Sequence, residues 1–240
     1  MNFLKCIDYQ SNVAGKIKEA LKTNKIVLLQ NCQEENLFDF YENLSNEIGH
    51  WVPMDEDVKT GEKTGNKWIE VKYDPQFPNS YRHSDTRQPL HTDGSYESDA
   101  PNITFFFCIE KAKIGGATTF FDYDDLVNTL KLYSEELLDR CKNIPLTFSK
   151  GKDSKTKTII QDGILTWNYY PAQSNNQEQS ELKENFHTFL EKKVVEGGLC
   201  MPLQLKPGDA VFFHDEKLLH GRNSFIGNRN LLKGGLSLTF

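Results

Sequence analysis

Apolar residues near the N-terminus recur at the spacing of an amphipathic helix. Val13, Ile17 and Leu21 fall on one helical face, with lysines and a glutamate around it, which predicts a helix packed on a core. Residues 25–30 (KIVLLQ) form an almost continuous apolar run and predict a buried strand. Residues 35–48 show the helical spacing again. The chain therefore opens with a helix, a strand and a second helix.

From residue 68 onward the pattern changes to short apolar runs bounded by Gly, Pro and polar residues. Such runs predict strands, which we place at 68–73, 103–109, 117–121, 144–148, 158–170, 201–205, 210–213 and 231–240. Two stretches with helical spacing interrupt them, at 123–141 and 180–195, and the second runs into Gly197-Gly198, a typical helix stop. Polar tracts at 55–67, 149–157 and 172–179 predict loops.

Many short strands and few helices favour a mostly β fold with flanking helices, a sandwich or jelly roll rather than an alternating α/β sheet. A length of 240 residues suits one large β domain. The sequence shows no internal repeat and no linker of Gly, Ser or Pro. We therefore expect a single domain over residues 1–240.

Composition narrows the classes of partner. The chain has 28 Lys and Arg against 34 Asp and Glu, a net charge of −6, and shows no basic stripe, which disfavours nucleic acid. No apolar run approaches the roughly 20 residues of a membrane span, and the N-terminus, with Asp8 early, does not resemble a signal peptide. The five cysteines are scattered without a C-x-x-C pair. We expect a cytoplasmic protein with a small-molecule partner; the oligomeric state is left open.

The histidines carry the most chemical information, because glycine patterns for nucleotides and nucleophile elbows are absent. In His91-Thr92-Asp93, residues i and i+2 of an extended segment project to one face, so imidazole and carboxylate can share a metal ion. The chain has a second such pair, His83 and Asp85. Taken alone, either pair is more often a loop or surface pair than a metal site.

The surroundings of His91 and Asp93 distinguish this pair. The segment reads PLHTDGSY at 89–96, followed by GGATTF at 115–120 and by PGDAVFFHDEKLLHGRNSF at 207–225, which contains His220. Two histidines and one carboxylate that leave other positions open are the ligand set of non-haem Fe(II) oxygenases. The open positions matter because a bidentate cosubstrate and O₂ must bind the same iron.

These three ordered segments resemble the TauD/TfdA family of Fe(II)/2-oxoglutarate-dependent dioxygenases, in particular its clavaminate synthase-like and γ-butyrobetaine hydroxylase-like branch. The resemblance covers residue 68 to the C-terminus. It implies a double-stranded β-helix (jelly roll) with Fe(II) held by His91, Asp93 and His220. His83 falls outside the motif, and His214 takes a place where the family often has a polar residue that is not a ligand.

The resemblance also implies residues that bind the cosubstrate. Thr118 matches the threonine that hydrogen-bonds the distal carboxylate of 2-oxoglutarate, although a strand threonine on a solvent face is the plainer alternative. An arginine on the last strand usually clamps the same carboxylate, and here Lys233 takes its place; an ammonium neutralises a carboxylate but cannot form the two-pronged pair. Arg229 is the second choice for this role, and loss of 2-oxoglutarate binding is the third. Arg222 either faces the cosubstrate or braces the site.

The implied reaction consumes O₂ and 2-oxoglutarate, releases succinate and CO₂, and hydroxylates or otherwise oxidises an unactivated C–H bond. Because Asp93 is present, halogenation is disfavoured, since halogenases of this type lack the carboxylate ligand. Tyr96, Trp167 and Asn168 are candidate pocket residues, although such aromatics are more often core. Arg87 could meet a substrate carboxylate or be an exposed cation. The loop at 55–67 is a candidate lid.

Three functions remain open from the sequence. The first is a hydroxylase of a small metabolite such as a free or carrier-linked amino acid. The second is a degenerate member that binds a ligand or partner without turnover, which Lys233 keeps open. The third is a metal enzyme that does not use 2-oxoglutarate, such as a zinc hydrolase; the Gly-Gly-Ala-Thr segment argues against it, because a hydrolase needs no cosubstrate anchor.

Overall fold

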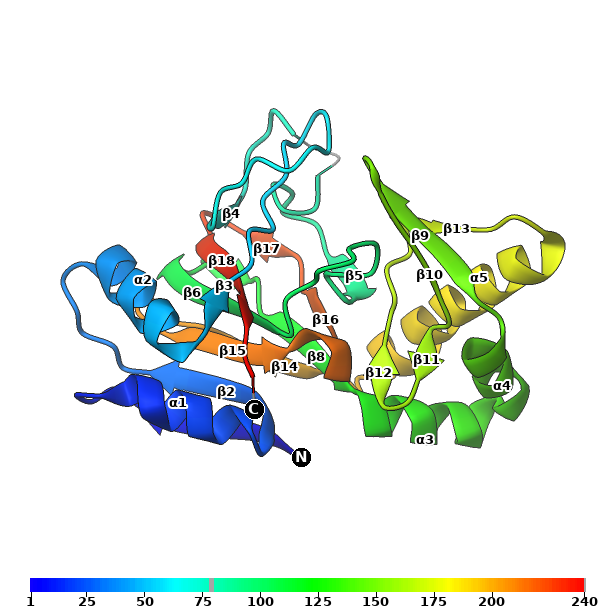
Figure 1. Cartoon of the computed structure of the whole chain (residues 1–240), viewed down its shortest axis with the longest axis horizontal. Helices are drawn as coiled ribbons and strands as arrows, with labels where there is room; N and C mark the ends of the chain where they lie inside the picture. The colour runs from blue at the N-terminus through cyan, green and yellow to red at the C-terminus, as the bar shows by residue number, and fades with distance from the viewer. Residues whose placement is uncertain (78–79, 240) are drawn as a thin grey trace.

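The computed structural model describes residues 1–77 and 80–239, and these contain two main sheets (Figure 1). The large sheet has the order β1 (Asn2–Asp8), β2 (Asn24–Gln30), β15 (Ala210–His214), β6 (Ile103–Glu110), β18 (Asn230–Ser237) and β3 (His50–Trp51), with β4 (Ile69–Lys72) also paired to β18. The small sheet has the order β14 (Met201–Leu203), β8 (Thr118–Asp122), β16 (Leu218–Arg222) and β5 (Gln88–His91). The first strand, which the sequence reading missed, runs parallel to β2, and all other paired strands are antiparallel.

Eight of these strands follow a regular path between the two sheets. We number these strands 1 to 8 in chain order: β4, β5, β6, β8, β14, β15, β16 and β18. In this numbering, the strand order is 1-8-3-6 in the large sheet and 2-7-4-5 in the small sheet. All but one of the successive connections therefore pass from one sheet to the other. An apolar cluster that includes Phe106 and Phe213 of the large sheet and Phe120 of the small sheet fills the space between them.

Helices cover the outer face of the large sheet. The helices α1 (Val13–Leu21) and α2 (Leu37–Ile48) lie where the sequence predicts them, and both contribute to one apolar cluster with strands of the large sheet. Ile17 and Tyr41 are fully buried there, as is Phe105 of β6. The predicted strand at 25–30 is β2, with its residues through Leu29 buried.

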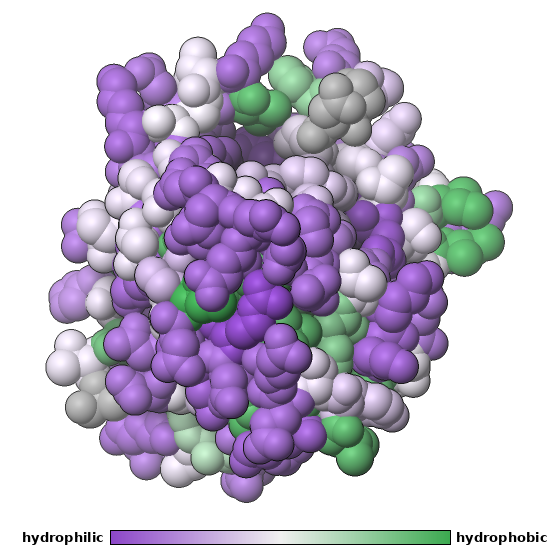
Figure 2. Space-filling view, turned by 90° about the vertical axis from the view of Figure 1, so that its right-hand side faces the viewer, coloured by the Kyte–Doolittle hydropathy of each residue, from purple (hydrophilic) through white to green (hydrophobic). Residues whose placement is uncertain are grey.

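A second group of elements packs on the outer face of the small sheet. It consists of α3 (Tyr123–Tyr133), α4 (Glu135–Asn143), β9 (Leu146–Lys150), β10 (Asp153–Lys157), β11 (Ile160–Gln161), β12 (Ile164–Leu165), β13 (Ala172–Gln173) and α5 (Gln177–Phe189), which continues as a π-helix over Leu190–Val195. We call residues 123–200 the helical lobe. Figure 1 shows it on the right, and Figure 2 shows that its outward face is largely hydrophilic.

Several local predictions for the helical lobe are wrong. The single helix expected at 123–141 breaks at Ser134, whose side chain accepts from the N–H of Leu137 and caps α4. The loop expected at 149–157 is the β9–β10 hairpin, and the tract at 172–179 contains β13 and the start of α5. The long strand expected at 158–170 turns back at Asp162-Gly163, where both residues have positive φ, and forms β11 and β12.

The remaining predictions are mostly confirmed. The tract at 55–67 is irregular apart from one bridge between Glu56 and Lys63. Strands at 68–73, 103–109, 117–121, 201–205, 210–213 and 231–240 match β4, β6, β8, β14, β15 and β18, with Phe240 outside the described residues. The sequence reading missed β3, β5, β7 (Ile114–Gly115), β16, β17 (Phe225–Ile226) and the 3₁₀ turn Asp215–Lys217. Within the described residues, no helix is both long and apolar enough to cross a bilayer.

Candidate metal centre

The small sheet brings the two candidate histidines together. The strands β5 and β16 are antiparallel neighbours, and their register places His220 directly opposite His91. Gly221 permits this close approach, because a Cβ at that position would lie 2.7 Å from the backbone oxygen of Gln88. The His-Gly-Arg motif therefore has a structural reason: the glycine lets β5 pack closely enough for the imidazoles to share one site.

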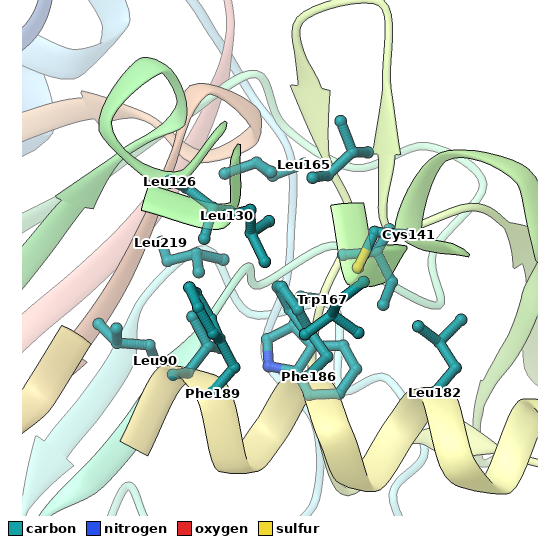
Figure 3. Packing of buried hydrophobic residues seen from close by; sticks show 14 of the residues in the cluster. Leu90, Leu126, Leu130, Cys141, Leu165, Trp167, Leu182, Phe186, Phe189 and Leu219 are labelled. Atoms are coloured by element: carbon teal, nitrogen blue, oxygen red, sulfur yellow. The ribbon is translucent and has the colours of Figure 1, made fainter. Parts of the chain in front are cut away.

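The neighbours of the two histidines face the opposite way. Side chains alternate along a strand, so Leu90 and Leu219 point away from the imidazoles. Both leucines belong to the apolar cluster of the helical lobe, with Phe189 of α5. Figure 3 shows them packed above that helix. The lobe thus backs the strands that carry the two candidate histidines.

The imidazoles and the carboxylate of Asp93 converge on one point. The Nε2 atom of His91 lies 3.6 Å from Oδ1 of Asp93, and Nε2 of His220 lies 3.5 Å from Oδ2. The three potential ligand atoms all lie within 4.8 Å of one another, and both histidines are buried. Two imidazoles and one carboxylate on one side of a site fit the facial triad of non-haem Fe(II), which leaves positions open for other ligands.

A hydrogen bond orients the imidazole of His91, and a carboxyl group faces the imidazole of His220. The Nδ1 atom of His91 lies 2.9 Å from the backbone oxygen of Pro89, so we assign the proton to Nδ1 and leave the lone pair on Nε2. The Nδ1 atom of His220 lies 3.4 Å from Oδ1 of Asp215. A carboxylate behind a ligating histidine fixes the ring and raises its basicity. The donor set and its supports therefore fit a bound divalent iron.

Asp215 is a site residue that sequence reasoning missed. Its buried carboxylate accepts hydrogen bonds from the backbone N–H groups of Asp93 and Gly94 while facing His220. It therefore links two candidate metal ligands from different segments, Asp93 in the turn after β5 and His220 on β16. The available signal was the acidic residue beside His214 in the FFHDE segment, but only the fold shows that it turns toward the metal centre.

The electrostatics of the centre follow from burial and close charges. Burial raises the pKa of the Asp93 carboxyl, but the ammonium of Lys233 and the imidazoles of His220 and His91 outweigh it and hold that pKa well below its usual range. Burial, followed by the charge of Asp93, raises the pKa of Asp215 to about 8. Burial and the nearby His91 lower the pKa of His220. Neutral imidazoles beside an ionised Asp93 are the forms that bind a metal.

A cavity of about 800 Å³ opens beside the metal centre and reaches His91, Asp93 and His220. This volume suits a small-molecule site. Of the predicted substrate contacts, Tyr96 and Asn168 line the cavity. The expected lid at 55–67 also contributes to its wall, through Glu56, Asp57, Val58 and Gly61.

The structure places the other two predicted substrate contacts, Arg87 and Trp167, away from the cavity. Arg87 donates to the carboxylate of Glu191 on the π-helix, so it ties the site segment to the helical lobe. Trp167 is fully buried against Phe186 in the apolar cluster of the lobe. Neither Arg87 nor Trp167 lines the cavity in this geometry, because each side chain is already used in packing or pairing.

Arg222 braces the site and does not face the cavity. Its guanidinium donates to the backbone oxygens of Tyr81, Ser84 and Thr86, at 2.7 to 3.0 Å. These bonds fix the segment that leads into β5. Of the two roles left open by the sequence, the structure favours the brace.

The predicted cosubstrate residues fall into two groups. Lys233, on β18, lines the large cavity, and its Nζ lies 2.6 Å from Oδ1 of Asp93. Thr118 and Arg229 lie apart from it and together line a second cavity of about 10 Å³. Thr118 is buried, which excludes the solvent-facing alternative. Lys233 of β18 and Arg229, the residue just before this strand, thus reach the interior at different places.

The chain belongs to the TauD/TfdA family: the sequence profile described as "Taurine catabolism dioxygenase TauD, TfdA family" matches residues 2–236. Among curated proteins, a trimethyllysine dioxygenase of Meyerozyma guilliermondii is 24% identical over 161 residues. That alignment covers 59% of this chain and 40% of the relative, so the chain spans well under half of the relative's length.

Solved structures show the same fold at low sequence identity. PvcB of Pseudomonas aeruginosa matches with a TM-score of 0.72 and 15% identity, over 98% of this chain and 86% of PvcB. An asparagine oxygenase crystallised with Fe(II), 2S,3S-3-hydroxyasparagine and succinate matches with a TM-score of 0.72 and 11% identity, over 95% of this chain and 80% of its own. The non-haem iron oxygenase OrfP, solved with Fe and α-ketoglutaric acid, matches with a TM-score of 0.66 and 12% identity. That match covers 95% of this chain and 80% of the OrfP chain.

Proposed function

We propose that this protein is an Fe(II)/2-oxoglutarate-dependent oxygenase that hydroxylates, or otherwise oxidises, an unactivated C–H bond of a small metabolite such as a free or carrier-linked amino acid. The observation that carries the proposal is the convergence of His91, Asp93 and His220 beside a cavity of about 800 Å³, in a chain of the TauD/TfdA family. The fold neighbours include oxygenases whose structures hold hydroxylated asparagine or arginine with succinate. These names support an amino-acid-like substrate.

The proposal also covers the fold, the cellular location and the class of partner. The strand orders 1-8-3-6 and 2-7-4-5 are those expected of a double-stranded β-helix, within one domain over residues 1–240. The five cysteines are unpaired, which supports a reducing cytoplasm. A small molecule is the proposed partner, with neither nucleic acid nor a membrane.

When bound, Fe(II) with 2-oxoglutarate and O₂ would supply the oxidant for the C–H bond. The protein's share is to hold and orient. His91, Asp93 and His220 would hold the iron from one side, while Pro89 and Asp215 fix the two imidazoles. Tyr96 and Asn168, which line the cavity, are the proposed substrate contacts.

Two cations are available to anchor the cosubstrate. We keep Lys233 as the proposed anchor, because it already lines the open cavity next to Asp93. Arg229 with Thr118 is the competing site. Arg229 is buried, and no carboxylate among the described residues lies within ion-pair distance of it; burial, then Arg222, lowers its pKa to about 9. A carboxylate entering there would have to displace neighbouring side chains.

An anaerobic titration with Fe(II) and 2-oxoglutarate tests the proposal, because the chelate gives a weak visible charge-transfer band. We expect the band in the wild-type protein and its weakening, by tenfold or more in cosubstrate affinity, in Lys233→Ala. Loss of the band in Arg229→Ala, with Lys233→Ala intact, would instead assign the anchor to Arg229 and Thr118. Iron binding without any band at high cosubstrate would refute the reaction, as would zinc in place of iron.

A further inference from the structure

Glu97 is a buried carboxylate in the wall of the cavity that the metal chemistry does not use. It lies four residues beyond Asp93, has 2% of its surface exposed and lines the cavity. Its Oε1 atom lies 3.4 Å from the ammonium of Lys63, a side chain that is 40% exposed. Its Oε2 atom is buried and has no hydrogen-bond partner.

The unpaired oxygen stands out within the cavity. Among the described residues, only two that line the cavity have a buried polar side-chain atom without a hydrogen bond: His220, whose Nδ1 faces Asp215, and Glu97. The other buried glutamate of the wall, Glu56, is fully paired. One of its oxygens accepts from the hydroxyl of Tyr96, at 2.9 Å, and the other from the ammonium of Lys150.

A buried carboxylate oxygen without a donor is costly to the fold. Burial raises the pKa of Glu97, Lys63 lowers it, Glu56 raises it further, and Lys233 opposes that rise. The charge of Glu97 is therefore incompletely compensated by the protein. Because Glu97 is a lining residue of the open cavity, a small rotation of its carboxylate would present this oxygen to a donor of a bound molecule.

We propose that Glu97 binds a cationic N–H group, an ammonium or a guanidinium, of the small molecule that this site oxidises. The inference rests on the proposed function and names the class of substrate within it. A cation supplies both the missing hydrogen bond and the missing charge, and such charge-assisted bonds are about twice as strong as neutral ones. The rings of Tyr96, Tyr169 and Tyr170 also line the cavity, and aromatic faces attract cations.

Paired ligands that differ by one cationic group test the proposal in the wild-type protein. The full chain, loaded anaerobically with Fe(II) and 2-oxoglutarate, is titrated in a calorimeter with lysine against norleucine, arginine against citrulline, and leucine against 4-methylpentanoate. These pairs separate a side-chain ammonium, a guanidinium and an α-ammonium. We expect the cationic member of at least one pair to bind at least tenfold tighter. Equal affinities in all three pairs would overturn the inference.

Variants assign the preference to Glu97. Glu97→Gln keeps the shape of the side chain and removes its charge, and we expect it to abolish the tenfold preference. Asp99→Asn, which removes one exposed charge in the same loop, should retain it. A preference that persists in Glu97→Gln would refute the role of this residue. The charge-transfer band reports separately on the proposed function: with the band present and no cation preference, the oxygenase assignment stands and only this inference fails.

Discussion

The two faces of the small sheet share the same strands but serve opposite purposes. The inner face presents His91 and His220 to the cavity, next to Asp93 and Lys233. The outer face presents Leu90, adjacent in sequence to His91, to a continuous apolar cluster of the helical lobe (Figure 3). The inner face concentrates buried charges, whereas the outer face is apolar and closely packed, and its cluster holds one unpaired polar group, the indole N–H of Trp167.

This difference shows how the fold separates stability from chemistry. Buried charges that are only partly paired weaken a fold, and here they cluster where a metal, a cosubstrate and a substrate would complete them. Apolar burial on the other face contributes roughly 25 cal/mol per Å² and holds the strands in register. Changes on the inner face should therefore affect binding, and changes on the outer face should affect unfolding.

The largest effect is expected on the inner face, from removal of a metal ligand. In His91→Ala, turnover should be abolished and Fe(II) affinity should fall by about a thousandfold or more, because only two protein ligands remain. Iron content and anaerobic Fe(II) titration measure this. His83→Ala, which alters the other His-x-Asp pair, should retain iron. If His91→Ala kept full iron stoichiometry and affinity, the site would lie elsewhere.

The next largest effect is expected in the apolar cluster of the lobe. Phe186 is fully buried and packs edge-on against Trp167, with ring centroids 4.7 Å apart. Phe186→Ala should lower the free energy of unfolding by about 3–5 kcal/mol, measured by urea denaturation, while folded protein still binds Fe(II). Asn185→Ala, at an exposed position of the same helix, should change it little. If the folded Phe186→Ala protein lost as much iron affinity as His91→Ala, the separation of the two faces would be contradicted.

The smallest effect is expected behind the metal ligands. Asp215→Asn preserves size but replaces the carboxyl group that faces His220 with an amide, and it weakens the acceptor for the N–H groups of Asp93 and Gly94. Fe(II) affinity should fall by about 10- to 100-fold, as is usual for such supporting residues. The matched Glu216→Gln removes a charge from the next, more exposed residue and should leave affinity unchanged. Equal Fe(II) affinities of Asp215→Asn and Glu216→Gln would show that Asp215 does not orient His220.

Much of the fold follows from local patterns. The spacing of Val13, Ile17 and Leu21 predicts α1, and the apolar run at 25–30 predicts β2, because burial of one face or of a whole strand leaves a periodic trace. Predictions failed where short-range chemistry was overlooked. Ser134 could have been recognised as a helix cap and Asp162-Gly163 as a hairpin turn.

By itself, the sequence determined the family motifs and the candidate metal ligands, because His91 and Asp93 are neighbours whose same-side projection is a local property of an extended chain. Only the tertiary structure decided which other residues lie next to His91 and Asp93. The antiparallel register sets His220 opposite His91, folding brings Asp215 behind the imidazole, and it leaves Oε2 of Glu97, a cavity-wall residue, without a hydrogen-bond donor. It also places Arg87 and Trp167 outside the lining of the cavity. Contacts between distant segments depend on strand register and packing, which no local pattern of residues specifies.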